Sequence, residues 1–152
     1  MRPSNSQSGV TLIEVVISIV VVAIAASAVL GLLSSNLRRS ADAQILSQGV
    51  AIATAYMEEI ALKPFTDPDG VDGEAGRTSY DDVDDYDGLS DSGAADQFGN
   101  PLADLSGYTV SVAVNSSAAL PGVAAADALR IDVRVQFAPY IDYTLTSYRT
   151  RL

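Results

Sequence analysis

Clustered carboxylates are the residues of this sequence with the clearest capacity for chemistry. Twelve of the 19 acidic residues fall between Asp67 and Asp104, and Arg77 is the single cation among them. Carboxylate oxygens at this density suit Ca²⁺, a hard cation that takes about six to eight oxygen ligands. The candidate ligands are Asp67, Asp69, Asp72, Asp84, Asp85 and Asp87.

The spacing of these acids excludes an EF-hand. That loop needs an acidic residue at its first position and a glycine at its sixth. With Gly70, Gly73 or Gly88 placed sixth, the first position holds Phe65, Pro68 or Val83. A calcium site would therefore be of another kind, and a solvated acidic loop or docking surface without metal is the alternative. No cofactor other than a structural Ca²⁺ is expected.

The sequence lacks the residue types that most other kinds of functional site require. The chain has no cysteine and no histidine, so thiolate nucleophiles, disulfides, the usual general base and the commonest zinc ligand are missing. The net charge of −10 argues against nucleic acid as a partner, because nucleic-acid binding needs clustered Lys and Arg. We therefore expect no enzyme.

One further carboxylate, Glu14, directly precedes a long apolar stretch. Residues 15–33 are 19 consecutive uncharged and mostly aliphatic residues. As a helix, about 20 such residues span the roughly 30 Å of a bilayer core, where an unpaired carboxylate is costly. Thr11 and Glu14 also fit a capping box, in which the carboxylate accepts a hydrogen bond from the N-cap amide, so a local role for Glu14 stays open.

The same helix is predicted to continue beyond the apolar stretch. Between residues 34 and 62 apolar residues recur near helical spacing among charged ones, which indicates one buried face. These apolar residues are Leu37, Ala41, Ile45, Ile52, Tyr56 and Ile60. Lys63 and Pro64 end the pattern, because proline disfavours helix at the preceding residue.

Three strand-like runs follow the acidic segment. Residues 108–114 and 129–137 alternate apolar and polar side chains, as half-buried strands do. Ala138 and Pro139 predict a turn, after which residues 140–148 complete an antiparallel hairpin. Packing a sheet of three or four strands on the second half of the helix would bury both apolar faces, which predicts an α+β fold.

At the N-terminus a polar leader ends in Gly9, and Val10-Thr11-Leu12-Ile13-Glu14 leads into the apolar stretch. This motif resembles that of type IV pilins and type II secretion pseudopilins. The resemblance implies a type IV pilin-like fold, and cleavage between Gly9 and Val10 by a prepilin peptidase that also methylates the amine of Val10. It implies that Glu14 meets the N-terminal ammonium of a neighbouring subunit during assembly.

Four further segments carry a finer resemblance: ATAYMEE at residues 53–59, LKPFTDPDG at 62–70, DDVDDYDG at 81–88 and FGNP at 98–101. They resemble the minor pilins of mannose-sensitive haemagglutinin (MSHA) pili. The resemblance implies a subunit of pilus initiation or of the pilus tip. Its partners would be prepilin peptidase, the major and other minor pilins and the inner-membrane assembly platform.

The expected organisation follows from these patterns. Residues 1–9 are the leader, residues 10–33 the transmembrane and assembly half of the helix, and residues 34–152 a periplasmic head. Within the head, the helix runs to residue 62, the acidic loop covers 65–106 and the sheet covers 107–149. Before assembly the chain would cross the inner membrane once, and after assembly it would lie in the pilus at the cell surface.

Two other classes remain open. A type II secretion minor pseudopilin would share the N-terminal motif. A secreted periplasmic binding domain would instead use residues 15–24 as a signal sequence, because Ala26-Ser27-Ala28 resembles a signal-peptidase site with cleavage after Ala28.

Overall fold

The computed structural model describes residues 11–70 and 74–151, with the backbone alone described for residues 35–41. Helix α1, Leu12–Ala61, runs through both structural units of the chain, Met1–Ala41 and Asp42–Leu152. In the first unit, Leu12–Ser34 is long and apolar enough to cross a membrane, with a mean hydropathy of 2.9 and none of its residues buried. The predicted leader, residues 1–9, lies outside the described residues.

Helix α1 ends at Ala61, one residue before its predicted end. The amide of Lys63 still donates a hydrogen bond to the carbonyl of Ile60 at 3.0 Å, which closes the last turn. Pro64 has no amide hydrogen to continue this pattern, as the sequence predicts.

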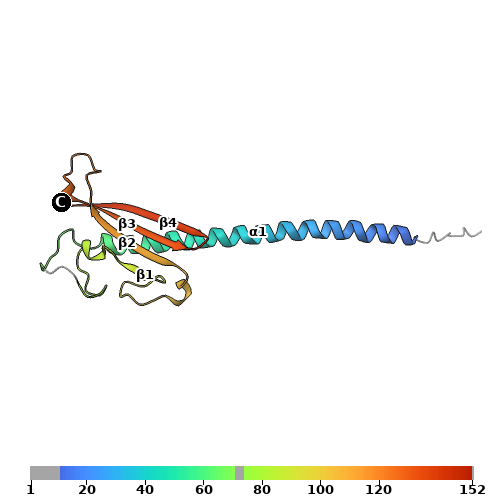
Figure 1. Cartoon of the computed structure of the whole chain (residues 1–152), viewed down its shortest axis with the longest axis horizontal. Coiled ribbons are helices and arrows are strands. Elements are labelled where there is room, and N and C mark those ends of the chain that lie inside the picture. The colour runs from blue at the N-terminus through green and yellow to red at the C-terminus, as the bar shows by residue number, and fades with distance from the viewer. Residues whose placement is uncertain (1–10, 71–73, 152) are drawn as a thin grey trace, which may run out of the picture. The chain divides into compact units, whose positions relative to one another are not determined.

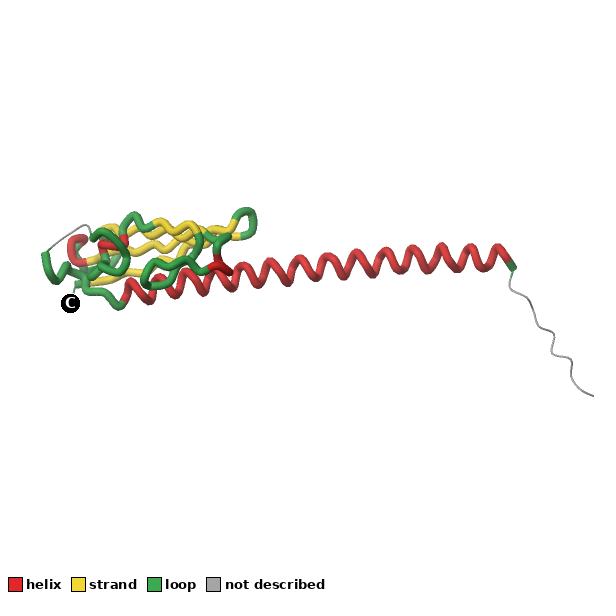
Figure 2. Tube along the Cα trace, turned by 90° about the horizontal axis from the view of Figure 1, so that it is seen from below, coloured by secondary structure: helices red, strands yellow, loops and turns green. Residues whose placement is uncertain are grey.

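The second unit contains a four-stranded antiparallel sheet in the order β1-β2-β3-β4. Its strands are β1 Ser90–Ser92, β2 Thr109–Ser116, β3 Ala128–Phe137 and β4 Ile141–Thr150. Three short 3-10 helices complete the unit: η1 Asp84–Tyr86, η2 Ala103–Leu105 and η3 Ala125–Asp127. Both views show the sheet along one side of the C-terminal part of α1 (Figures 1 and 2). This arrangement confirms the predicted α+β class with a helix on a small antiparallel sheet.

The core lies between α1 and the inner face of the sheet. The helix buries Ile52, Ala53, Tyr56, Met57 and Ile60, and the sheet buries Val110, Val112, Val114, Ile131, Val133 and Val135, with Tyr108 just before β2. Strands β2 and β3 contribute every second residue, as the alternation predicts. Helix and hairpin approach closely at Gly49, where an added Cβ would collide with Cδ1 of Ile141.

The acidic segment departs from the predicted loop. It contains η1, β1 and η2, and it places Val83, Tyr86 and Ala94 in the core with no more than 1% of each residue exposed. The amide of Val83 donates a hydrogen bond to the carbonyl of Pro64 at 3.1 Å, which fixes the segment beside the end of α1. The prediction missed β1 because Ser-Asp-Ser has little strand propensity, and its pairing with β2 uses the backbone.

Candidate functional site

Glu14 lies in the first turn of α1 with its carboxylate unengaged among the described residues. The carbonyl of Thr11 accepts hydrogen bonds from the amides of Glu14 and Val15, at 3.1 and 3.2 Å. Within residues 11–70 and 74–151, however, the side chains of Thr11 and Glu14 make no reciprocal capping bonds. The capping box is therefore not formed, and the local explanation for Glu14 loses its support.

The surroundings of Glu14 are apolar and open. Its face of the helix continues with Val15, Ser18, Ile19 and Val22, all of which are exposed. Ser18 donates its hydroxyl hydrogen to the Glu14 carbonyl at 2.7 Å and leaves the carboxylate alone. Glu14 is thus the one charged residue of Leu12–Ser34, and it needs a cationic partner once water is excluded. Gly9 and Val10, the predicted cleavage pair, lie outside the described residues.

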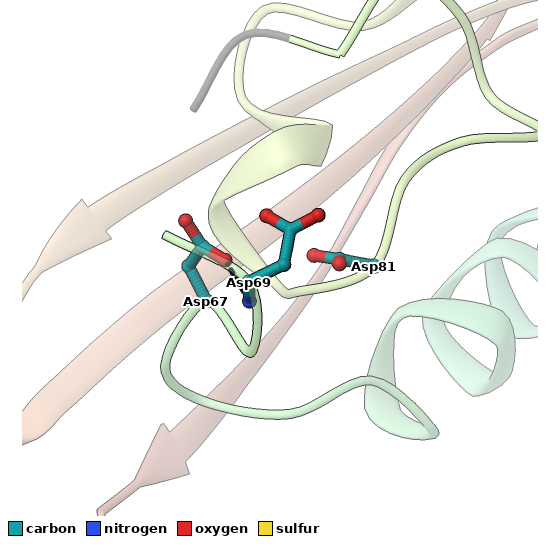
Figure 3. Close-up of side chains that lie close together, drawn as sticks. All are labelled: Asp67, Asp69 and Asp81. Carbon is teal, nitrogen blue, oxygen red and sulfur yellow. Dashed lines mark hydrogen bonds between the residues drawn. The ribbon is translucent and has the colours of Figure 1, made fainter. Parts of the chain in front are cut away.

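In the second unit, the fold gathers acidic residues from three parts of the chain into two adjoining groups. Asp67, Asp69 and Asp81 form one group, and Glu74, Asp81 and Asp85 form the other, with the ligand atoms of each group within 4.8 Å of one another. Figure 3 shows the side chain of Asp69 between those of Asp67 and Asp81. Asp81 belongs to both groups, although it was not among the six candidate ligands.

Backbone amides hold two of these carboxylates in place. Oδ1 of Asp67 accepts the amides of Asp69 and Gly70 at 2.8 and 2.7 Å. Oδ2 of Asp85 accepts the amides of Asp81 and Asp82 at 2.8 and 3.2 Å. The positions of these oxygens are therefore set by the turns themselves.

Mutual repulsion in the two groups shows in their protonation. A hydrogen bond to Asp85 raises the pKa of Glu74 above its usual range. Burial raises the pKa of Asp81, and the nearby charges of Asp69 and Asp67 raise it further. In addition, Oε2 of Glu74 and Oδ1 of Asp81 are buried and have no hydrogen-bond partner among residues 11–70 and 74–151. A bound cation would relieve both the repulsion and these unsatisfied oxygens.

The other predicted ligands are not brought into these groups. Asp84 donates its amide to Oδ1 of Asp82 at 3.0 Å within the turn that carries η1. Asp87 accepts the amide of Val114 through Oδ1 at 2.8 Å, which ties the end of η1 to β2. Asp72 lies outside the described residues. Of the six candidates, the structure therefore places Asp67, Asp69 and Asp85 in clusters, with Asp81 and Glu74 added to them.

A buried polar network joins the acidic segment to α1, and sequence reasoning missed it. Arg77 binds Glu59 through two hydrogen bonds, Nε to Oε1 at 2.9 Å and Nη2 to Oε2 at 2.6 Å, and Asp91 through Nη1 at 2.9 Å. Its guanidinium lies 4.2 Å from the ring centroid of Tyr56. The hydroxyls of Tyr56 and Tyr86 donate to Asp91 and Glu59, at 2.6 and 2.8 Å.

The network keeps Glu59 ionised inside the head. Burial alone would raise the pKa of Glu59, but the hydrogen bonds from Arg77 and Tyr86 lower it below its usual range. The sequence held one signal for this arrangement, because Arg77 is the single cation within the acidic segment. Its partners could not be read from spacing, since Glu59 lies 18 residues away on α1.

Comparison with known proteins supports the N-terminal assignment. Residues 4–30 match the family model of the prokaryotic N-terminal methylation motif. No curated protein and no solved structure matches the chain. The motif indicates a type IV pilin-like substrate of prepilin peptidase, and the apolar helix Leu12–Ser34 is consistent with a membrane anchor. The long helix packed on an antiparallel sheet is consistent with a pilin-like fold.

Proposed function

We propose that this chain is a minor type IV pilin of the MSHA type, closest to the D-type minor pilin of those pili. Prepilin peptidase would cut between Gly9 and Val10 and methylate Val10, and residues 10–33 would then anchor the chain in the inner membrane. The head would lie in the periplasm and contribute to pilus initiation, to assembly or to the pilus tip. Its partners would be the major pilin, other minor pilins and the inner-membrane assembly platform.

The observation that carries this proposal is the methylation motif at residues 4–30, which overlaps the exposed apolar helix Leu12–Ser34. A single carboxylate at the start of that helix suits an assembly step in which charges pair inside an apolar filament core. The finer MSHA assignment draws support from the segments at residues 53–59, 62–70, 81–88 and 98–101. The first three of these segments contain residues of the Arg77 network or of the acidic groups.

Mass spectrometry of the mature chain tests the processing step. The expected N-terminus is N-methylated Val10. This processed form should be absent from a strain without prepilin peptidase and from the Gly9→Val variant. The valine side chain would obstruct the close approach of the protease to the backbone. A mature chain that starts at Val29 would instead establish the secreted domain cleaved after Ala28. An intact Met1 would establish an ordinary membrane anchor.

A type II secretion minor pseudopilin is the alternative within this class. The N-terminal motif serves both systems, so the discriminating measurement is the phenotype of a deletion strain. Loss of surface pili with normal protein secretion is expected for an MSHA-type minor pilin. Loss of secretion with normal pili would assign the chain to the secretion system.

We also propose that the acidic groups bind a structural Ca²⁺. Asp67, Asp69, Asp81, Glu74 and Asp85 would supply carboxylate oxygens, which are the donors that Ca²⁺ prefers. The unsatisfied buried oxygens of Glu74 and Asp81 favour this proposal over a fully solvated acidic surface. When bound, the ion would offset the mutual repulsion of these carboxylates.

Limited proteolysis of the full chain in Ca²⁺ and in EDTA tests the metal proposal. We expect slower cleavage within residues 67–104 when Ca²⁺ is present, because the ion would join segments that otherwise repel. Asp81→Asn should abolish the protection, since Asp81 belongs to both groups. Asp104→Asn is the matched control, because Asp104 belongs to neither group. Identical cleavage in Ca²⁺ and EDTA would retire the proposal.

A further inference from the structure

The two edges of the sheet differ in how well they are protected against additional strands. An edge strand presents unpaired backbone amides and carbonyls, and proteins blunt such edges by keeping them short or by adding lysine, proline or a bulge. Strand β1 forms one edge and has only three residues, whereas β4 forms the other and has ten (Figure 1). The β4 edge is therefore the one that needs explanation.

Strand β4 has few of these features, and its protection is limited to two charged residues, Asp142 and Arg149, near its two ends. Its sequence, IDYTLTSYRT, contains no lysine, proline or glycine. Its pairing with β3 is regular from Phe137↔Ile141 to Ala128↔Thr150, without a bulge. The edge is long, regular and rich in threonine and tyrosine, which are residues that favour strands.

The backbone groups that face outward follow from the register. Arg151 donates its amide to the carbonyl of Asp127 at 2.9 Å, and these two residues continue the β3–β4 register. In antiparallel pairs, residues that share hydrogen bonds alternate with residues that do not. Odd-numbered residues of β4 therefore bond to β3, and even-numbered ones turn their amides and carbonyls away. The latter are Asp142, Thr144, Thr146, Tyr148 and Thr150.

The described residues offer these outward groups no other backbone partner. Within residues 11–70 and 74–151, no backbone hydrogen bond outside the β3–β4 pairing reaches the even-numbered residues of β4. The inner face beside them is also incompletely covered, since Tyr143 and Leu145 are only half-buried. An added strand would satisfy the backbone and extend the cover over these side chains.

Charge indicates which kind of strand would bind there. The unit Asp42–Leu152 carries 18 acidic and six basic residues, a net charge of −12. Strand β4 itself is neutral, because its two charged residues are Asp142 and Arg149. Oδ1 of Asp142 accepts a hydrogen bond from Nε of Arg134 at 2.7 Å. A second copy would bring the same strongly negative charge and be repelled, so a strand from a less acidic protein is favoured.

We propose that the β4 edge binds an extended, non-acidic strand of a partner protein, which adds to the sheet as a fifth strand. The partner's backbone would pair with the outward groups of Thr144, Thr146 and Tyr148. This inference does not depend on the pilin role, because it rests on the sheet of the head alone.

A peptide with the sequence of β3, ALRIDVRVQF, is a suitable probe. The peptide carries two arginines and one aspartate, so it is not acidic. The same sequence, as strand β3, pairs with the opposite edge of β4 within the chain, so it is able to form a strand beside β4. The full chain is held in nanodiscs at one copy per disc, and binding is followed by fluorescence anisotropy. Thr146→Pro removes an outward amide and should weaken binding by about tenfold, whereas Thr146→Val keeps the amide and should bind as the parent does.

Amide hydrogen exchange of the unmodified chain provides a second measurement of peptide binding at β4. The amides of Thr144, Thr146 and Tyr148 should exchange quickly in the free chain and become protected when the β3 peptide is added. Those of Tyr143, Leu145 and Ser147 should be slow throughout, which also verifies that each variant is folded. Unchanged exchange, equal binding of a scrambled peptide, or β4-to-β4 association of two copies would each overturn the proposal.

Discussion

Glu14→Gln should leave the chain in the membrane and exclude it from filaments. Glutamine keeps the size and hydrogen-bonding capacity of the side chain but removes its charge. Membrane insertion depends on the uncharged apolar stretch at residues 15–33, which the substitution does not touch. Because breaking a buried ion pair costs about 3–5 kcal/mol, incorporation should fall at least about tenfold.

The measurement compares the amount of subunit in sheared filaments with the amount left in the membrane. Glu58→Gln is the matched control, since Glu58 lies on the same helix but is exposed in the second unit. That variant should assemble normally. Incorporation of Glu14→Gln at the parental level would contradict the charge-pairing role of Glu14. Loss of a capping bond could not explain a defect, because the side chains of Thr11 and Glu14 form no such bond.

Local patterns account for the parts of the fold that the sequence predicts well. Pro64 ends α1 because its ring and missing amide act on the residues next to it. The alternation in β2 and β3 places Val110, Val112, Val133 and Val135 inside because side chains of a strand alternate between two faces. These features need no knowledge of distant parts of the chain.

Features that join distant residues could not be predicted in this way. Strand β1 exists because the backbone of Ser90–Ser92 meets β2, and nothing in Ser-Asp-Ser favours that pairing. Asp81 enters both acidic groups because the chain returns to Asp67 and Asp69 after Arg77. The density of acids along the sequence indicates the segment, but the folding of that segment decides which oxygens meet.

The buried network around Arg77 is the clearest case, and it gives the largest expected effect on stability. The side chain of Arg77 is 5% exposed, and those of Glu59 and Asp91 are 16% and 20% exposed. Arg77→Leu would leave both carboxylates without their cation, which costs about 3–5 kcal/mol. The urea midpoint for unfolding of the full chain in detergent should fall by about 2 M. The tyrosines allow the transition to be followed by near-ultraviolet circular dichroism.

Arg134→Leu is the control, because the Arg134–Asp142 pair is about half exposed on both sides and its loss should change the midpoint little. The double variant Arg77→Leu with Glu59→Leu separates charge from packing. If an orphaned carboxylate causes the loss, removing Glu59 as well should restore part of the stability, since a buried ion pair can be replaced by apolar residues at low cost. A double variant no more stable than Arg77→Leu would instead assign the loss to the stacking of Arg77 on Tyr56 and to packing around it.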